Sequence, residues 1–332
     1  MNDRAPPILS LRGLTTSLRT EHGTTRVLDD VSLDVPSSGK VALVGESGSG
    51  KTMIALSVMR LLPPHPHCVV GGQVIFRDRD LLSLPEREMR KIRGNELSMI
   101  FQEPMTSLNP VLTVGYQITE TLRAHLPISR KEARERGTEL LHRVGIASPA
   151  ERMDAYPHQL SGGMRQRVMI AIAVCCRPAL ILADEPTTAL DVTTQASILD
   201  LLDQVREEDG TATLLITHDL GLVARYAQEV VVLYAGQVVE TASVRDIFRA
   251  PLHPYTQALL RSLPTSPDCA GNSSMRLPTI DGRVPEPGAW PLGCRFQDRC
   301  AHVREVCRSE PPPWLELGPG VGVRCAIGGV GA

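Results

Sequence analysis

Aromatic residues are scarce in this chain, and positive charge is not in excess. Phe, Tyr and Trp make up 3% of the 332 residues, so few rings are available to stack on nucleic-acid bases. Lys and Arg number 35 against 37 Asp and Glu, which gives a formal net charge of -2. Proteins that bind nucleic acid usually present a strongly basic face. We therefore expect no nucleic-acid partner.

Long apolar segments are also missing. The longest uninterrupted apolar run covers residues 168–176, whereas a helix needs about 20 apolar residues to cross a bilayer. The start of the chain, MNDRAPPILS, does not show the basic start followed by an apolar core that is typical of a signal peptide. These absences predict a protein that stays in the cytosol and is held at a membrane only by partners.

The composition that remains is typical of a folded protein with about two domains. Hydrophobic residues make up 42% and charged residues 22%, which excludes a disordered chain. Apolar runs alternate with helical patterns over about the first 250 residues, which predicts an α/β core with a largely parallel sheet. Runs 8–14 and 31–35 predict an added antiparallel β-layer. The other expected strands cover residues 40–45, 73–76, 97–101, 180–184, 213–217 and 230–234, and the expected helices cover 51–62, 193–205 and 220–227.

Two regions depart from this rhythm. Residues 103–176 have helical stretches such as 130–144 and few strand signals, which predicts an inserted helical subdomain. Residues 264–332 hold ten of the 26 prolines, and a sequence so rich in proline argues against a conventional apolar core. We therefore divide the chain into a domain at 1–263 and an extension at 264–332. Four of the eight cysteines fall in this extension: Cys294, Cys300, Cys307 and Cys325.

The clearest motif is GESGSGKT at residues 45–52. It matches G-x-x-x-x-G-K-[ST], follows a predicted strand and precedes a predicted helix, which is the setting of a phosphate-binding loop. The glycines let backbone N–H groups turn toward phosphates, and the helix N-terminus adds partial positive charge. Lys51 can reach the β- and γ-phosphates, and the Thr52 hydroxyl can ligate Mg²⁺.

Two further motifs complete the pattern. LILADEP at 180–186 is an apolar strand that delivers two carboxylates to its C-terminal edge, where ligands bind in open α/β sheets. There Asp184 could hold Mg²⁺ through a water, and Glu185 could take a proton from an attacking water. LSGGMRQR at 160–167 begins a helix with free N–H groups and predicts a second phosphate contact, which we assign to a nucleotide on another subunit.

Together these motifs resemble the ATP-binding subunits of ABC transporters. Six features follow that family's order and approximate spacing: the phosphate loop, Gln102 after strand 97–101, the 160–167 signature, the Asp184–Glu185 pair, the loop 189–191, and His218 after strand 213–217. The resemblance implies an α/β ABC-type nucleotide-binding domain with a RecA-like core, an antiparallel β-layer and a helical subdomain. The small cysteine-containing extension would follow it.

The same resemblance implies a role for each residue. Lys51, Glu185 and His218 would be catalytic, with Glu185 polarising the lytic water and His218 orienting it. Thr52 and Gln102 would ligate Mg²⁺. The residues implied to bind ATP are Gly45, Ser47, Gly48, Ser49, Gly50, Lys51, Thr52, Gln102, Ser161, Gly162, Gly163, Asp184 and Asp191.

Implied partners follow from these roles. Ser161, Gly162 and Gly163 would clamp the ATP of a second ATPase subunit, and Asp191 would link the two sites. Gln102 would couple the site to two membrane permease subunits. An extracytoplasmic substrate-binding protein would deliver the cargo to these permeases. The chain would then be peripheral, on the cytoplasmic face of the membrane.

Segments 253–264, 277–287 and 293–300 are similar to the extension of the dipeptide/oligopeptide importer subfamily, as is 101–110. In some members of that subfamily the matching cysteines hold a four-iron four-sulfur cluster. Four thiolates also suit Zn²⁺, although the C-x-x-C pairs typical of structural zinc are absent. Unliganded thiols remain the third alternative.

Some questions stay open at this level. The ATPase does not touch the cargo, so nickel, an opine or glutathione could replace peptides. A non-transport ABC ATPase of DNA repair or translation is disfavoured, because coiled coils, zinc-finger pairs and a second cassette are missing. Leu18 stands where the subfamily usually has an aromatic residue that stacks on adenine, which weakens the expected base selectivity. Lys40 replaces a usual Glu before its strand.

Overall fold

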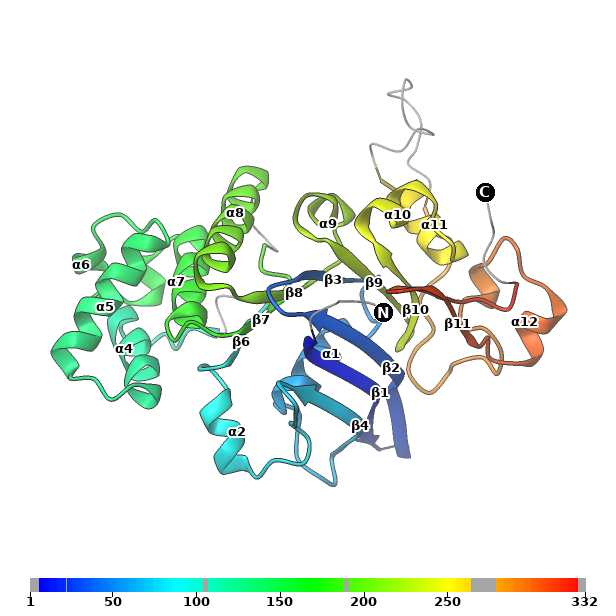
Figure 1. Ribbon diagram of the computed structural model, residues 1–332, viewed down its shortest axis with the longest axis horizontal. Helices are drawn as coiled ribbons and strands as arrows, with labels where there is room; N and C mark the ends of the chain where they lie inside the picture. The colour runs from blue at the N-terminus through cyan, green and yellow to red at the C-terminus, as the bar shows by residue number, and fades with distance from the viewer. Residues whose placement is uncertain (1–5, 22, 104–106, 188–190, 264–278, 328–332) are drawn as a thin grey trace, which may run out of the picture. The chain divides into compact units, whose positions relative to one another are not determined.

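The computed structural model describes residues 6–21, 23–103, 107–187, 191–263 and 279–327. The chain forms two compact units. The β-rich unit contains residues 9–34, 40–82 and 216–332, and the helical unit contains 83–215 with two short N-terminal pieces, 1–8 and 35–39. Figure 1 shows the helices and strands of both units. The described part of the chain contains no helix with the length and apolar character needed to cross a membrane.

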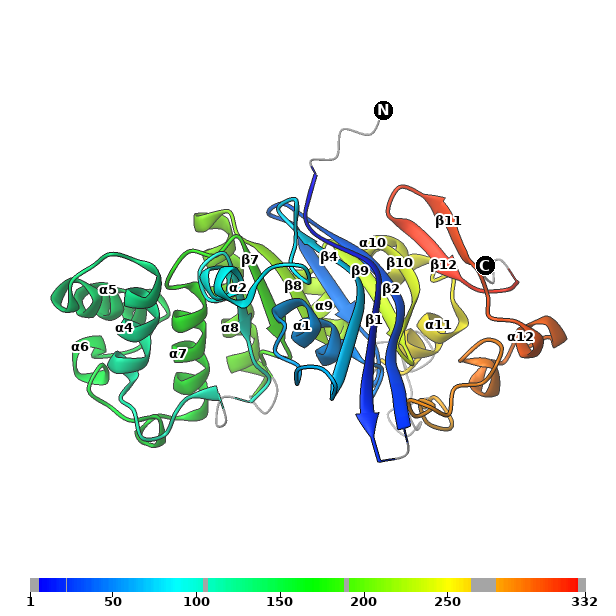
Figure 2. The same cartoon turned by 90° about the horizontal axis from the view of Figure 1, so that it is seen from below.

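An antiparallel layer forms one part of the β-rich unit, in the strand order β2-β1-β4-β5. Figure 2 shows β1, β2 and β4 side by side. Apolar residues point to one face of each strand, as the alternation of buried Val31 and Leu33 with exposed neighbours in β2 shows. At Gly13 the register of β1 shifts, and its φ of 57° is the left-handed conformation that glycine adopts without strain. The bounds are β1 (Pro7–Thr20), β2 (Gly23–Pro36), β4 (Cys68–Phe76) and β5 (Arg79–Asp80).

Parallel and antiparallel pairing meet in the other sheet of this unit, where the strand order is β11-β12-β10-β9-β3. β3 and β9 pair in parallel and are buried along nearly their whole length, which explains their uninterrupted apolar sequences. The bounds are β3 (Lys40–Val44), β9 (Glu229–Tyr234), β10 (Gln237–Ser243), β11 (Trp314–Gly318) and β12 (Val321–Arg324). Its helices are α1 (Lys51–Met59), α9 (Leu220–Tyr226), α10 (Val244–Arg249), α11 (Pro254–Arg261), the 3-10 turn η3 (Gln297–Arg299) and α12 (Glu305–Ser309).

The extension has an apolar core, contrary to the expectation from its composition. Phe296 is 2% exposed and packs in one cluster with Tyr234 and Tyr255 of the preceding domain. β12 pairs antiparallel with β10, so the extension also adds to an existing sheet. The prediction was wrong because it counted only apolar residues within the extension, whereas these residues are buried against strands and helices that precede it. Residues 264–278, where two of the similar segments begin or end, lie outside the described residues.

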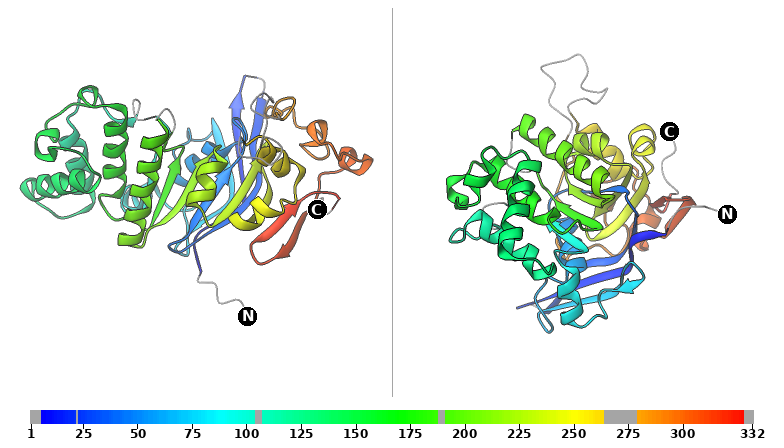
Figure 3. Two further views of the ribbon diagram at one scale, coloured as in Figure 1. Left: turned by 90° about the horizontal axis from the view of Figure 1, so that it is seen from above. Right: turned by 60° about the vertical axis from the view of Figure 1, so that its left-hand side comes forward.

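The helical insertion predicted at 103–176 falls within the helical unit, which also contains buried strands. Figure 3 shows its green helices grouped together, and α4, α5 and α7 contact one another. Thr113 and Ser129 accept hydrogen bonds from backbone N–H groups in the first turns of α4 and α5, which begins both helices. The helices are α2 (Glu86–Ile92), α4 (Val114–His125), α5 (Arg130–Arg143), α6 (Pro149–Arg152), η1 (Pro157–Gln159), α7 (Gly162–Val174) and α8 (Val192–Asp209).

Buried parallel strands complete this unit. β6 (Leu97–Ile100) pairs in parallel with β7 (Leu180–Asp184), and every residue of both strands is buried. β8 (Ala212–Thr217) follows next to β7. The carboxyl end of β7 presents Asp184, and Gln102 follows β6, so parallel pairing places both at one sheet edge. The predicted α/β fold class is confirmed.

Candidate functional site

The phosphate loop, residues 45–52, joins β3 to α1 in the β-rich unit. Gly45 has no room for a side chain, because a Cβ there would lie 2.2 Å from the Leu233 carbonyl oxygen and 2.8 Å from Ser49 Oγ. Gly48 needs its positive φ of 82°, although the space around it is open. Gly50 ends the loop as the N-cap of α1. The loop is therefore a tight, glycine-rich turn that leads into the N-terminus of α1, the kind of place where backbone N–H groups bind anions.

Lys51 is 6% exposed, and its ammonium group is held inside the loop. Its Nζ donates to the carbonyl oxygen of Gly45 at 2.8 Å and to that of Glu46 at 3.1 Å. A buried ammonium with carbonyl partners can exchange them for phosphate oxygens, which carry full negative charge. Ser49 Oγ is buried and has no hydrogen-bond partner in the described part of the chain, and a phosphate oxygen would supply one. Thr52, the predicted Mg²⁺ ligand, is exposed.

Gln102 and Glu185 meet in the helical unit. Gln102 Nε2 donates to Glu185 Oε2 at 2.9 Å, across 83 positions of sequence. Glu185 directly follows β7 and has a φ of 44°, a left-handed backbone conformation that costs a non-glycine residue about 1–3 kcal/mol. Such strain at a polar residue is typical of functional sites. Asp184, which precedes it, is 1% exposed and belongs to the strand itself.

The signature segment begins α7. Ser161 is the N-cap, and its Oγ accepts the Met164 N–H at 3.3 Å. Ser161 and Gly162 are exposed, and Gly163 is half-buried. This helix N-terminus, with its partial positive charge, is thus accessible to another molecule.

Comparisons with known proteins agree with this geometry. The family model for ABC transporters matches residues 28–188. A protein of Sinorhizobium fredii named "Probable peptide ABC transporter ATP-binding protein" is 50% identical over 98% of this chain and 96% of its own length. The chain belongs to the ABC transporter family. The resemblance found in the sequence is confirmed.

Further comparisons concern a transport relative, a solved cassette and the C-terminal region of this ABC protein. The "Oligopeptide transport ATP-binding protein AppD" of Bacillus subtilis is 48% identical and covers 96% of both chains. A solved dimeric ATP-binding cassette in a post-hydrolysis state with ADP and phosphate is 31% identical, with a TM-score of 0.64 over 71% of this chain and 99% of that one. A second family model, for the oligopeptide/dipeptide transporter C-terminal region, matches residues 239–307.

Three residues assigned from the ABC resemblance lie outside the loops described so far. His218 follows β8, belongs to the β-rich unit and is exposed. Asp191 caps α8, where its carboxylate accepts the Thr194 N–H at 2.9 Å and the Thr194 hydroxyl at 2.7 Å. The neighbouring Ala189 and Leu190 lie outside the described residues. Leu18 pairs with Cys68 between β1 and β4 and is half-buried.

The four extension cysteines line one small pocket of the ABC protein, together with the buried ring of Phe296. Burial raises the pKa of the Cys294 thiol to about 11 and also raises the pKa of Cys300. Among the described residues, no three His, Cys, Asp or Glu side chains are arranged to hold a metal ion. The fold therefore gathers the thiols without arranging them as a ligand set.

Sequence reasoning missed three residues that contact the phosphate loop. Tyr255 Oη accepts the backbone N–H of Glu46 at 2.8 Å. Arg299 binds the Glu46 carboxylate, and the Gly236 N–H donates to the Ser49 carbonyl oxygen at 2.8 Å. Tyr255 belongs to the 253–264 segment that is typical of the subfamily, which could have drawn attention to it. Nothing local to Arg299 or Gly236 indicates a contact with residues about 200 or more positions away.

Proposed function

We propose that this chain is the ATPase subunit of an ABC importer that takes up di- or oligopeptides. The observation that carries the proposal is the loop at 45–52, where a buried ammonium lies in a glycine-rich turn at a helix N-terminus, the form that a polyphosphate requires. The peptide cargo is supported by the match of residues 239–307 to the oligopeptide/dipeptide transporter C-terminal region. The names of the Sinorhizobium fredii and Bacillus subtilis relatives support it as well.

In the β-rich unit, residues 45–52 would hold the phosphates. Lys51 Nζ would leave its two carbonyl partners for phosphate oxygens, and the N-terminus of α1 would add its partial charge. The Thr52 hydroxyl would be a Mg²⁺ ligand, and bound Mg²⁺ would supply neutralisation of charge on the phosphates. His218 would orient the attacking water.

In the helical unit, Glu185 would accept a proton from water. The hydrogen bond from Gln102 Nε2 would orient the carboxylate that acts as the base. Asp184 would take part in holding Mg²⁺, with Gln102 as a further ligand. Positioning and electrostatic stabilisation would supply most of the rate, as in other phosphoryl transfers.

A second ATPase subunit would complete the site. Ser161 and Gly162 are exposed at the start of α7, which fits a role toward a nucleotide bound elsewhere. The 31% identical cassette is described as a dimer with ADP and phosphate, which supports this arrangement. Asp191 would then link the two sites of the dimer.

Permease subunits would bind the helical unit. Val111 is 76% exposed and Tyr116 is 51% exposed, and such apolar side chains suit a protein partner. An extracytoplasmic binding protein would deliver the peptide to those permeases. The ATPase would then sit peripherally on the cytoplasmic face of the membrane.

The four extension cysteines would hold a metal centre, and we favour a four-iron four-sulfur cluster over Zn²⁺. Four sulfur donors line one pocket, although among the described residues they are not arranged as a ligand set, and the subfamily resemblance favours the cluster. Bound, the cluster would supply a cross-link within the extension. The thiols would lose their protons on binding, since thiolates are the ligands.

The test of ATP hydrolysis is Glu185→Gln in the complex with its permeases and binding protein. The amide still accepts from Gln102 but cannot act as a base, so we expect turnover to fall by about 100-fold or more while ATP binding persists. Glu139→Gln, at an exposed position of α5, is the control and should leave turnover unchanged. Near-normal hydrolysis in Glu185→Gln would contradict the assignment. ATP-driven uptake of nickel or glutathione, but not of peptides, into vesicles would contradict the cargo.

A further inference from the structure

Glu46 places a carboxylate inside a loop that binds anions. It follows Gly45 and precedes Ser47, and its side chain is 30% exposed. An uncompensated negative charge at this point would repel a polyphosphate. The structure compensates it with one residue of the extension, Arg299. We infer that Arg299 is a positioning residue for nucleotide binding, which neutralises Glu46 and holds the phosphate loop in its binding form. This inference rests on the proposed function.

The contact between the two side chains is bidentate. Arg299 Nη1 lies 2.7 Å from Glu46 Oε2, and Nη2 lies 2.9 Å from Glu46 Oε1. Each terminal guanidinium nitrogen therefore faces one carboxylate oxygen, which fixes the orientation of the two side chains as well as pairing their charges. The Arg299 side chain is only 5% exposed, so water screens the pair weakly.

Arg299 is also held in place by other residues of the extension. Its Nε donates to the Asp281 carbonyl oxygen at 2.8 Å, and Nη2 donates to that of Ile280 at 3.2 Å. Phe296, at the start of the same 3-10 turn, packs against Tyr234 and Tyr255 with ring centroids 5.2 and 5.4 Å away. The guanidinium group is thus presented to the loop in a set direction, with little conformational freedom left to lose.

Glu46 in turn controls the catalytic lysine through its backbone. Its carbonyl oxygen accepts from Lys51 Nζ at 3.1 Å and from the Ser49 N–H at 3.2 Å. Its own N–H donates to Tyr255 Oη at 2.8 Å. A change in the position of Glu46 would therefore move the anchor of Lys51 and the turn at Ser49. Arg299 therefore acts on the nucleotide through these residues.

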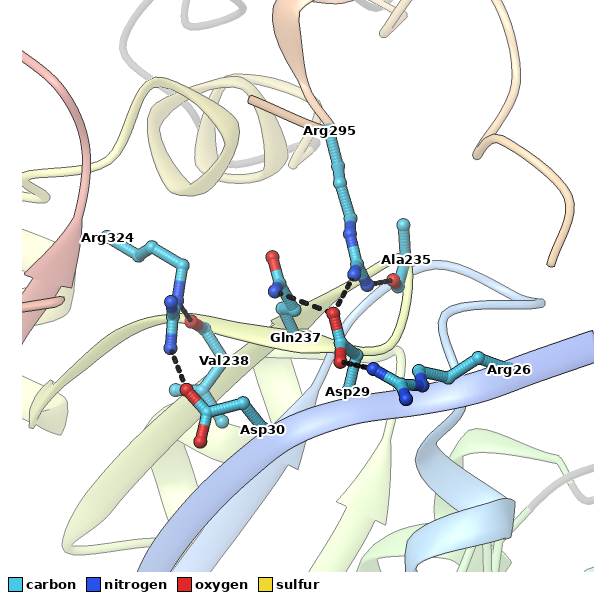
Figure 4. A network of polar contacts seen from close by, with 8 residues as sticks. All are labelled: Arg26, Asp29, Asp30, Ala235, Gln237, Val238, Arg295 and Arg324. Atoms are coloured by element: carbon cyan, nitrogen blue, oxygen red, sulfur yellow. Dashed lines mark hydrogen bonds and ion pairs between the residues drawn. The ribbon is translucent and has the colours of Figure 1, made fainter. Parts of the chain in front are cut away.

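Two other arginines of the extension provide matched controls (Figure 4). Arg295 pairs with Asp29 of β2 and donates to the Ala235 carbonyl oxygen, while Arg324 pairs with Asp30 at 3.2 Å and donates to that of Val238. Their side chains are 10% and 13% exposed, so they resemble Arg299 in burial and in pairing. In the part of the chain that the structure describes, neither bonds a residue of the phosphate loop. Substituting one of these arginines removes an ion pair of the extension but leaves the charge on Arg299, so the two effects can be told apart.

The experiment measures binding of a fluorescent ATP analogue to the purified full chain, with KM and kcat in the assembled transporter. Arg299→Ala should weaken nucleotide binding by about tenfold or more, because Glu46 then stands uncompensated. The KM should rise more than kcat falls. Arg299→Lys keeps the charge but loses the bidentate contact, so it should bind more tightly than Arg299→Ala and more weakly than the wild type. Arg295→Ala should bind as the wild type does.

The decisive variant is the double substitution Arg299→Ala with Glu46→Gln. Removing the carboxylate should restore binding to within about threefold of the wild type, which a lost structural contact would not do. If the double variant binds no better than Arg299→Ala, or if Arg295→Ala weakens binding as much, the inference is overturned. Failure of the proposed function would look different, because the wild type and Lys51→Ala would then bind the analogue equally poorly.

Discussion

Gly236 is a position in the β-rich unit where an added methyl group would clash with backbone. It lies in the turn between β9 and β10, with a φ of 77°. Its N–H donates to the Ser49 carbonyl oxygen at 2.8 Å, and its own carbonyl oxygen accepts the Asp29 N–H at 2.9 Å. A Cβ would lie 2.2 Å from the Val27 carbonyl oxygen and 3.1 Å from the Trp290 ring. Gly236→Ala must therefore move backbone.

The magnitude follows from two contributions. An alanine in the left-handed conformation costs roughly 1–2 kcal/mol. Relief of the contact with Val27 separates the turn from β2 or from the phosphate loop, and each hydrogen bond lost costs about 1 kcal/mol. With one of these bonds lost, the sum is about 2–3 kcal/mol in the free energy of unfolding. Because Ser49 belongs to the phosphate loop, ATP binding should weaken as well.

Gly13→Ala is the control for backbone strain alone. Gly13 has a φ of 57°, and its added Cβ would meet only Asp30 Oδ1, at an ordinary 3.7 Å. The expected loss is about 1–2 kcal/mol, with ATP binding unchanged. Urea unfolding followed by tryptophan fluorescence measures both variants, since the chain's two tryptophans, Trp290 and Trp314, lie in the β-rich unit. Equal losses for the two variants, to within about 0.5 kcal/mol, would refute the steric argument.

Three further predictions concern the nucleotide and the extension. Mixed dimers that carry Ser161→Arg in one subunit and Lys51→Ala in the other should keep one working site, because both lesions strike the same composite site; loss of both sites would contradict action across the interface. Leu18→Tyr should tighten ATP relative to GTP by about 1 kcal/mol through stacking, and an unchanged ratio would mean that adenine is held elsewhere. Protein purified without oxygen should be brown, with about four irons per chain; colourless protein with about one zinc would select the zinc alternative, and metal-free, alkylatable thiols would contradict both.

The sequence alone determined the elements whose chemistry is local. The phosphate loop needs glycines, a lysine and a following helix within eight residues, so its pattern is complete in one segment, 45–52. The same is true of the helix that Ser161 begins and of the buried strand that ends at Asp184. The order of these motifs was enough to predict the ABC resemblance and the α/β fold class, because each motif carries its own backbone requirement.

Only the tertiary structure decided which distant residues serve the loop. Arg299 and Glu46 are 253 positions apart, and no periodicity or spacing relates them. Gln102 reaches Glu185 because β6 and β7 pair in parallel, and the extension finds its core because Phe296 packs against Tyr234 and Tyr255. Such contacts depend on the register of strands and on burial against elements that precede them. A local sequence pattern contains neither kind of information. For this reason the composition led to a wrong prediction for the extension and gave no sign of the arginine that faces the phosphate loop.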